Sequence, residues 1–310
     1  MRLIRRLFAS PGSVGARIGV ALLGVALLGA ACGSDDAGRS SQEPVVDVVA
    51  STALIADWVS QVGGERVRAR SLVESGADVH TWQPEPSQVI AIAEADVVLL
   101  SGGGLEAGFE SLVRRNVGGS LIVLADAIDL HAFAPGLGEA HEDDARDPHF
   151  WLDPERAIVA IERVRDVLIG LDPAGADGYR ARAAAYLGEV RAVDAEVGAL
   201  LAALPPERRV LVTFHDAYGY FARRYGLTIL GFVVEGPEVE PSAADIAALV
   251  EGMKGAGAGV IFREPQFSAR VVQRVADDAG AEVRPIYSQL SGEVDSYLGL
   301  LRANAASISE

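Results

Sequence analysis

A single long helical pattern divides this 310-residue chain into two parts. No proline occurs from Ala174 to Leu204, and Asp172-Pro173 is a suitable helix start because proline is tolerated in a first turn. Apolar residues recur at three- and four-residue steps, at Tyr179, Ala183, Tyr186, Leu187, Val190, Val193, Val197, Leu200 and Leu201. This pattern predicts one helix of about 30 residues, roughly 45 Å long. We expect a strut between two lobes.

On both sides of this helix, strand patterns alternate with helix patterns. Before it, strands are expected at 45–50, 67–72, 96–100 and 121–124, and helices at 52–62, 86–93, 105–116 and 154–168. After it, strands are expected at 209–214, 227–234, 259–262 and 283–287, and helices at 242–254, 268–279 and 295–308. Such alternation indicates an α/β fold with parallel sheets. We therefore predict two parallel-sheet α/β lobes, 45–172 and 206–310, joined by a rigid connecting helix, 173–205, with a cleft between the lobes.

The N-terminus has the pattern of an export signal. Arginines flank an apolar stretch, 18–31, that is too short to span a bilayer comfortably. Small residues then lead to Cys32, the only cysteine, and this resembles a bacterial lipoprotein signal. We expect a signal peptide at 1–31, lipidation of Cys32, a flexible tether at 32–44, and a protein anchored at the extracellular face of the cytoplasmic membrane. An ordinary cleaved signal with an incidental cysteine is the alternative.

The charge of the chain limits its partners. The formal net charge is −16, and loss of the signal's four arginines makes it −16 − 4 = −20. A protein this acidic is a poor binder of nucleic acid and of anionic membranes. We therefore expect it to contact the membrane only through the lipid. Without a cysteine beyond Cys32, no disulfide can stabilise the folded part, and burial of apolar surface must suffice.

Three of the five histidines have distinctive surroundings: His80, His149 and His215. They are 69 and 66 residues apart, so only a tertiary fold could bring them together. Three converging imidazoles suit a zinc site, because neutral imidazole is a good ligand for a borderline metal. Asp147-Pro148 fixes a turn before His149, and Asp216 follows His215. A carboxylate or carbonyl commonly holds the second ring nitrogen of such a ligand, but the sequence does not assign it.

The other two histidines, His131 and His141, lie in an irregular stretch, 131–146. One interpretation is a solvated surface loop. The other is a loop at the mouth of the site that collects metal weakly.

Several segments, in order, resemble the solute-binding proteins of bacterial zinc/manganese ABC importers, most of all the zinc-specific members. They are 76–80 with 84–87, 147–154, 214–221, 262–268 and 297–304. The resemblance implies that His80 and His149 from the first lobe and His215 from the second hold a metal across the cleft. It also implies capture of a divalent metal outside the cytoplasm and delivery to an ABC permease with its ATPase. We expect a monomer.

The fourth ligand is where the chain departs from many relatives, which carry an aspartate after the last strand. Here that place holds Gln289, and Asp295 follows a short loop. Gln289 offers only a neutral amide oxygen, while Asp295 is better explained as a helix N-cap. Water or another carboxylate remains an alternative, and Glu264 and Glu235 are candidates for support or charge balance.

Ligand type favours Zn²⁺, because three imidazoles without an assured carboxylate suit zinc better than manganese. Mn²⁺ or Fe²⁺ binding by the same type of transporter protein is the first alternative. A secreted zinc-dependent hydrolase is a second, with Glu264 or Glu235 as base, but no His-Glu-x-x-His helix is present, so we expect no enzyme. A cell-adhesion role is a third, and nothing in the sequence supports it.

Overall fold

The computed structural model describes residues 46–133, 145–237 and 239–310. The predicted signal peptide, the tether, Cys32 and His141 lie outside these residues. Within them, no helix is both long enough and apolar enough to cross a membrane.

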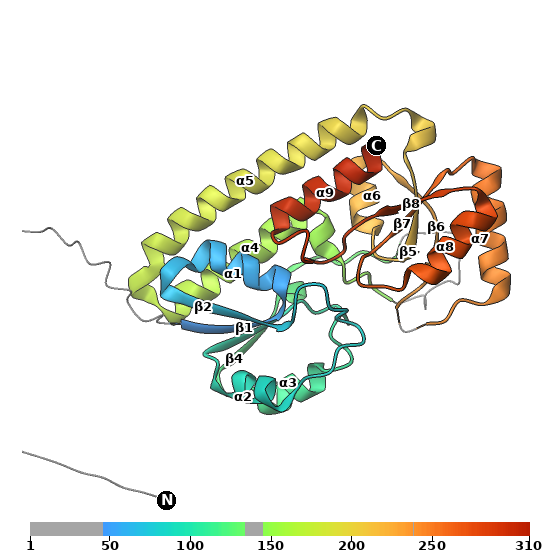
Figure 1. The fold of residues 1–310 in the computed structure, drawn as a ribbon. Coiled ribbons are helices and arrows are strands. Elements are labelled where there is room, and N and C mark those ends of the chain that lie inside the picture. Colours follow the sequence, from blue (N-terminus) through green and yellow to red (C-terminus); the bar gives the residue numbers. More distant parts are fainter. Residues whose placement is uncertain (1–45, 134–144, 238) are drawn as a thin grey trace, which may run out of the picture. The chain divides into compact units, whose positions relative to one another are not determined.

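The first lobe is a four-stranded parallel sheet with strand order β2-β1-β3-β4. Its strands are β1 (Val46–Thr52), β2 (Val67–Val73), β3 (Val97–Leu100) and β4 (Ser120–Val123). Its helices are α1 (Ala53–Gly63), α2 (Pro86–Glu94) and α3 (Glu110–Asn116), with short 3₁₀ turns at Gly64–Arg66 and Leu124–Ala127. Figure 1 shows α1 on one face of this sheet and α2 with α3 on the other. The predicted arrangement of a parallel sheet covered by helices is confirmed.

The second lobe repeats this topology with strand order β6-β5-β7-β8, again all parallel. Its strands are β5 (Val210–His215), β6 (Thr228–Val234), β7 (Val260–Arg263) and β8 (Glu282–Pro285). Its helices are α6 (Gly219–Tyr225), α7 (Ala243–Ala256) and α8 (Ala269–Ala279), and α9 (Tyr297–Ser309) ends the chain. Ser242 and Asp245 form the capping box of α7 that the sequence predicts, and Ser268 caps α8.

The connecting helix is α5 (Ala176–Ala202), whose 27 residues span roughly 40 Å. A 3₁₀ turn at Pro173–Gly175 precedes it, so the α-helix starts later than expected. Every predicted core position of the helix is buried except Leu200, which is 43% exposed. The helix packs against α4 (Pro154–Leu171), α1 and α9.

Two expectations about local structure were wrong, and one helix was missed. Helix α3 begins at Glu110 rather than at 105, because three glycines with positive φ, 102 to 104, turn the chain after β3. Ser296, not Asp295, caps α9, since the Ser296 side chain accepts the backbone N–H of Gly299. Helix α6 was not predicted at all.

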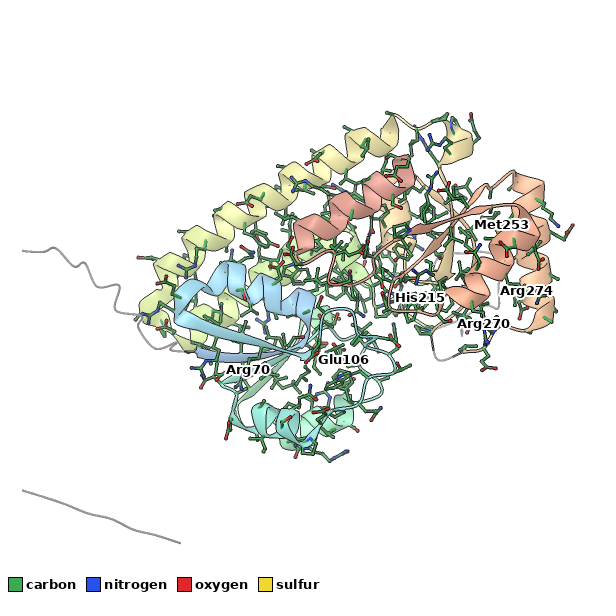
Figure 2. The ribbon with its side chains drawn as sticks, viewed as in Figure 1. Arg70, Glu106, His215, Met253, Arg270 and Arg274 are labelled. Atoms are coloured by element: carbon green, nitrogen blue, oxygen red, sulfur yellow. The ribbon has the colours of Figure 1, made fainter. Side chains whose placement is uncertain are left out.

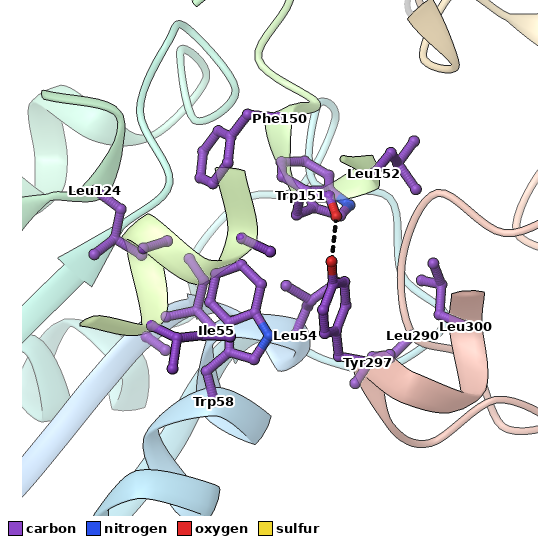
Figure 3. Close-up of a cluster of buried hydrophobic side chains, with 14 of the residues drawn as sticks. Leu54, Ile55, Trp58, Leu124, Phe150, Trp151, Leu152, Leu290, Tyr297 and Leu300 are labelled. Carbon is purple, nitrogen blue, oxygen red and sulfur yellow. Dashed lines mark hydrogen bonds between the residues drawn. The ribbon is translucent and has the colours of Figure 1, made fainter. Parts of the chain in front are cut away.

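One hydrophobic core runs through both lobes. It includes side chains of α1, α4, α5 and α9 together with strands of both sheets, and a second cluster lies beneath α7 and α8. Trp58 of α1 and Tyr297 of α9 meet edge to face, with ring centroids 5.4 Å apart (Figure 3). The C-terminal helix therefore packs onto the first lobe as well as the connecting helix.

Candidate metal centre

The fold brings His80, His149 and His215 together. One ligand atom from each lies within 4.8 Å of the others, and no other such group of histidine, cysteine or acidic side chains occurs among the described residues. The ring centroids are 5.6 Å apart for His80 and His149, 5.8 Å for His80 and His215, and 5.3 Å for His149 and His215. The structure thus unites the three histidines that the sequence selects, while their role as ligands stays a prediction.

All three histidines lie at or after the end of a strand or just before a helix. His215 is the last residue of β5, His80 follows β2 through a turn, and His149 precedes the 3₁₀ turn Phe150–Leu152 that leads into α4. Figure 2 shows His215 on the inner side of the second lobe. The carboxyl ends of parallel strands are where α/β sheets generally place ligand sites.

The histidines line a cavity of about 230 Å³. Its wall also contains Gly103, Gly104, Phe133, Arg146 and Pro148 from the first lobe and Asp216, Glu235, Gly236 and Val239 from the second. A larger groove of about 830 Å³ lies between α7 and α8, near the Arg270 and Arg274 labels in Figure 2, and contains no histidine. Chemistry rather than size therefore identifies the candidate site.

A buried carboxylate orients His149. Asp147 Oδ1 lies 2.9 Å from both the ring Nδ1 and the backbone N of His149, and Asp147 is wholly buried. Burial raises the pKa of Asp147 well above its usual range, against the effect of the backbone N–H of His149. A dication bound to His149 would favour the ionised carboxylate, which accepts Nδ1–H and leaves the Nε2 lone pair for the metal.

A second buried carboxylate serves His215. Glu264, which follows β7, places Oε1 2.6 Å from His215 Nδ1, and neither residue is more than 1% exposed. Burial alone would lower the pKa of His215, but the negative charge of the nearby Glu264 outweighs it and raises this pKa. His215 Nε2 is buried and has no hydrogen-bond partner among the described residues. The pairing that the sequence left open therefore falls to Glu264 and not to Asp216.

His80 is the most exposed ligand candidate and is held by a local turn. Asp78 Oδ1 accepts the backbone N–H of His80 at 3.1 Å, and Asp78 Oδ2 accepts the Thr81 hydroxyl at 2.6 Å. The backbone N–H of Gly76 donates to Leu290 O at 2.9 Å, which ties this turn to the second half of the chain. Asp78 thus organises the loop as an Asx turn.

Neither Gln289 nor Asp295, the residues considered for a fourth ligand, lines the cavity, and Asp295 is exposed. Two carboxylates do line it: Asp216, directly after β5, and Glu235, directly after β6. Both follow neighbouring strands of one sheet. Both are candidates from the sequence, Asp216 beside His215 and Glu235 for support or charge balance, and their position at the strand ends is the signal that places them in the cavity wall.

Sequence reasoning also missed Tyr220. Its hydroxyl donates to Asp147 O at 3.1 Å and accepts the backbone N–H of His131 at 2.8 Å. The rings of His131 and Tyr220 stack with centroids 5.2 Å apart, and burial, reinforced by Arg156, lowers the pKa of His131. His131 therefore packs beside the His149 segment and does not line the cavity.

Comparisons with known proteins find relatives over nearly the whole of the two lobes. The family described as "Zinc-uptake complex component A periplasmic" (ZnuA) matches residues 48–310. The chain is 27% identical to the manganese-binding lipoprotein MntA of Halalkalibacterium halodurans, over 89% of this chain and 91% of that protein. It is 28% identical to the iron ABC transporter substrate-binding lipoprotein MtsA of Streptococcus pyogenes serotype M1, over 88% and 90%.

Among solved structures, a zinc-bound deletion mutant of ZnuA superposes with a TM-score of 0.76. The identity is 30%, and the match covers 85% of this chain and 96% of that one. Because the family match extends over both lobes and the connecting helix, the chain belongs to the ZnuA family of solute-binding proteins of metal ABC importers.

Proposed function

We propose that this protein binds one divalent transition metal ion, Zn²⁺ in the first instance, through His80, His149 and His215, and delivers it to an ABC permease. The observation that carries the proposal is the meeting of three imidazoles within 4.8 Å in a cavity. Buried carboxylates at the second ring nitrogens of His149 and His215 support it. Outer partners of this kind are typical of metal-bound histidines.

Zinc is favoured because the three clustered groups are all nitrogen donors. Three neutral imidazoles leave a dication uncompensated, and ionised Asp147 and Glu264 would together balance two positive charges. The relatives are named for manganese, iron and zinc, so Mn²⁺ or Fe²⁺ is the alternative cargo. A harder metal would need an oxygen ligand, and Asp216 or Glu235 could supply it from the cavity wall.

Delivery implies a place outside the cytoplasm. We propose lipidation at Cys32 after a signal peptide at 1–31, a tether at 32–44, and lobes at 45–172 and 206–310 joined through 173–205. The two relatives described above are both named lipoproteins, which supports the anchor. The permease and its ATPase would be the partners of a monomeric carrier.

Glu235, one of the two bases considered for a hydrolase, lines the cavity, but a hydrolase that uses Glu264 is disfavoured by the position of Glu264. This carboxylate is wholly buried and lies against His215 Nδ1, so it is not placed to activate a water in the cavity. Names of the relatives as binding proteins point the same way. No feature of the residues that the structure describes supports an adhesion role.

The first test is elemental analysis of the mature protein after equal exposure to Zn²⁺, Mn²⁺ and Fe²⁺ and exhaustive desalting. We expect about one retained zinc per chain, because Zn²⁺ binds nitrogen-rich sets more tightly than the other two. Retained manganese or iron would assign a carboxylate from the cavity wall to the site. A protein that retains no metal, while a circular dichroism spectrum shows it folded, would contradict the proposal.

A further inference from the structure

The segment 297–304 is singled out by the sequence but contributes nothing to the cavity. It forms the first turns of α9, and Tyr297 is completely buried. Such a residue could be ordinary core. Its hydrogen bonds, however, lead towards the metal centre.

His149 enters the centre on a tight backbone turn. The carbonyl of His149 accepts the N–H of Leu152 at 3.1 Å, which closes the 3₁₀ turn. The indole of Trp151 packs against the imidazole of His149, with ring centroids 5.4 Å apart and planes at 66°. The position of the His149 ring therefore depends on where the backbone and ring of Trp151 are held.

Trp151 is held from the far end of the chain at two atoms. Its Nε1–H donates to Ser288 O at 2.7 Å, and its carbonyl accepts the Tyr297 hydroxyl at 2.8 Å. The dashed line in Figure 3 marks the second bond. Both anchors are buried, so water does not compete for them.

Tyr297 and its helix are fixed in turn. Asp57 Oδ2 accepts the backbone N–H of Tyr297 at 3.0 Å, and the Tyr297 ring stands edge-on to Trp58. Two turns further on, Asn304 accepts Tyr287 N–H and donates to Tyr287 O, both at 2.8 Å, which fixes the segment that presents Ser288. Helix α9 thus fixes both groups that bond to Trp151: it carries Tyr297, and through Asn304 it holds the segment of Ser288.

We propose that Tyr297 is a positioning residue of the metal centre, acting through Trp151 on His149. The inference rests on the proposed function, since it concerns how well the ligand set is held. Metal–ligand distances tolerate only about 0.2 Å, so a looser turn at His149 weakens the site without touching a ligand. Loss of the Tyr297 hydroxyl would therefore weaken the retention of metal, while other contacts keep the two lobes folded.

The test compares Tyr297→Phe with Tyr179→Phe. Both tyrosines are 0% exposed, and each hydroxyl makes a hydrogen bond of 2.8 Å. Tyr179, however, donates to Asp172 at the C-terminal end of α4, and neither tyrosine lines the cavity. Zinc-loaded proteins are mixed with excess chelator, and zinc release is followed by stopped flow. Thermal unfolding of the metal-free forms records the stability lost in each variant.

We expect Tyr297→Phe to release zinc about three- to tenfold faster than wild type, less than loss of a direct partner of a ligand would cause. Tyr179→Phe should release zinc at the wild-type rate although it loses comparable stability. Trp151→Phe, which removes the donor to Ser288 O, should also release zinc faster.

A wild-type release rate in Tyr297→Phe would overturn the inference, as would an equal rise in both tyrosine variants, because general loosening would then explain it. A wild-type protein that retains no zinc is a different result. It would refute the proposed function itself.

Discussion

Replacing Glu264 by glutamine tests the electrostatic design of the metal centre. The glutamine keeps the size of the side chain and an oxygen that can accept His215 Nδ1–H, so mainly the charge is lost. Since Oε1 lies 2.6 Å from Nδ1, a metal on Nε2 would lie about 6 Å from the carboxylate. At an effective dielectric constant of about 20, that separation is worth about 3 kcal/mol per unit of metal charge.

Screening by the imidazoles and by the retained amide dipole reduces this figure. Loss of an outer partner of a metal-bound histidine typically lowers affinity by about 10- to 100-fold. We therefore expect Glu264→Gln to weaken zinc binding by about 1.4–2.7 kcal/mol, measured by calorimetry with a competing chelator.

The metal-free protein should respond differently. Glu264 and His215 are a buried pair in which the histidine is charged only when it is protonated. With glutamine beside it, His215 can give up that proton, so no unpaired charge stays in the interior and the substitution costs little. The Tm of metal-free Glu264→Gln should stay within about 3 °C of wild type. Glu251→Gln, which removes an exposed charge from α7, is the matched control and should change neither quantity.

Unchanged zinc affinity in Glu264→Gln would contradict this prediction, because the buried charge would then have no effect on the metal. A fall in affinity together with a large fall in the Tm of the metal-free protein would also refute it. That result would mean that Glu264 supports the fold rather than the charge balance of the site.

Three further predictions concern other parts of the molecule. His149→Ala should lower zinc affinity at least about tenfold in the same titration while the circular dichroism spectrum stays native, and unchanged affinity would remove His149 from the site. Metal binding should slow hydrogen exchange near His80, His149 and His215 but not in the middle of α5, and identical exchange in both forms would exclude ordering of the cleft. The guanidinium of Arg66 lowers the pKa of Asp172 from 3.8 to about 2, so the stability that Asp172 contributes is fully present above about pH 4 and lost as pH falls towards 2. The Tm difference between wild type and Asp172→Asn should therefore shrink from pH 6 to pH 3, and a constant difference would contradict this linkage.

Most helices and strands were predictable because the spacing of apolar residues within each one shows which of its faces is buried. The period of apolar residues in α5 marks the buried face. Leu200 is exposed although Leu201, one residue nearer the helix end, is buried, because Leu200 lies at the edge of that face. Helix α6 has only seven residues and no side-chain cap at its N-terminus, so a single-sequence pattern gives little sign of where it begins. Missing α6 also meant missing Tyr220.

Local sequence determined the strand and helix order, the strut between two sheets and the three candidate histidines, because turn residues, periodicity and rare residue types act over short distances. Tertiary structure alone decided the partners of those histidines. Glu264 reaches His215 from a neighbouring strand 49 residues later, and Asp216, although adjacent in sequence, does not take that place. Side-chain pairs across a sheet depend on strand order and register, which follow from the packing of the whole core and not from any one segment.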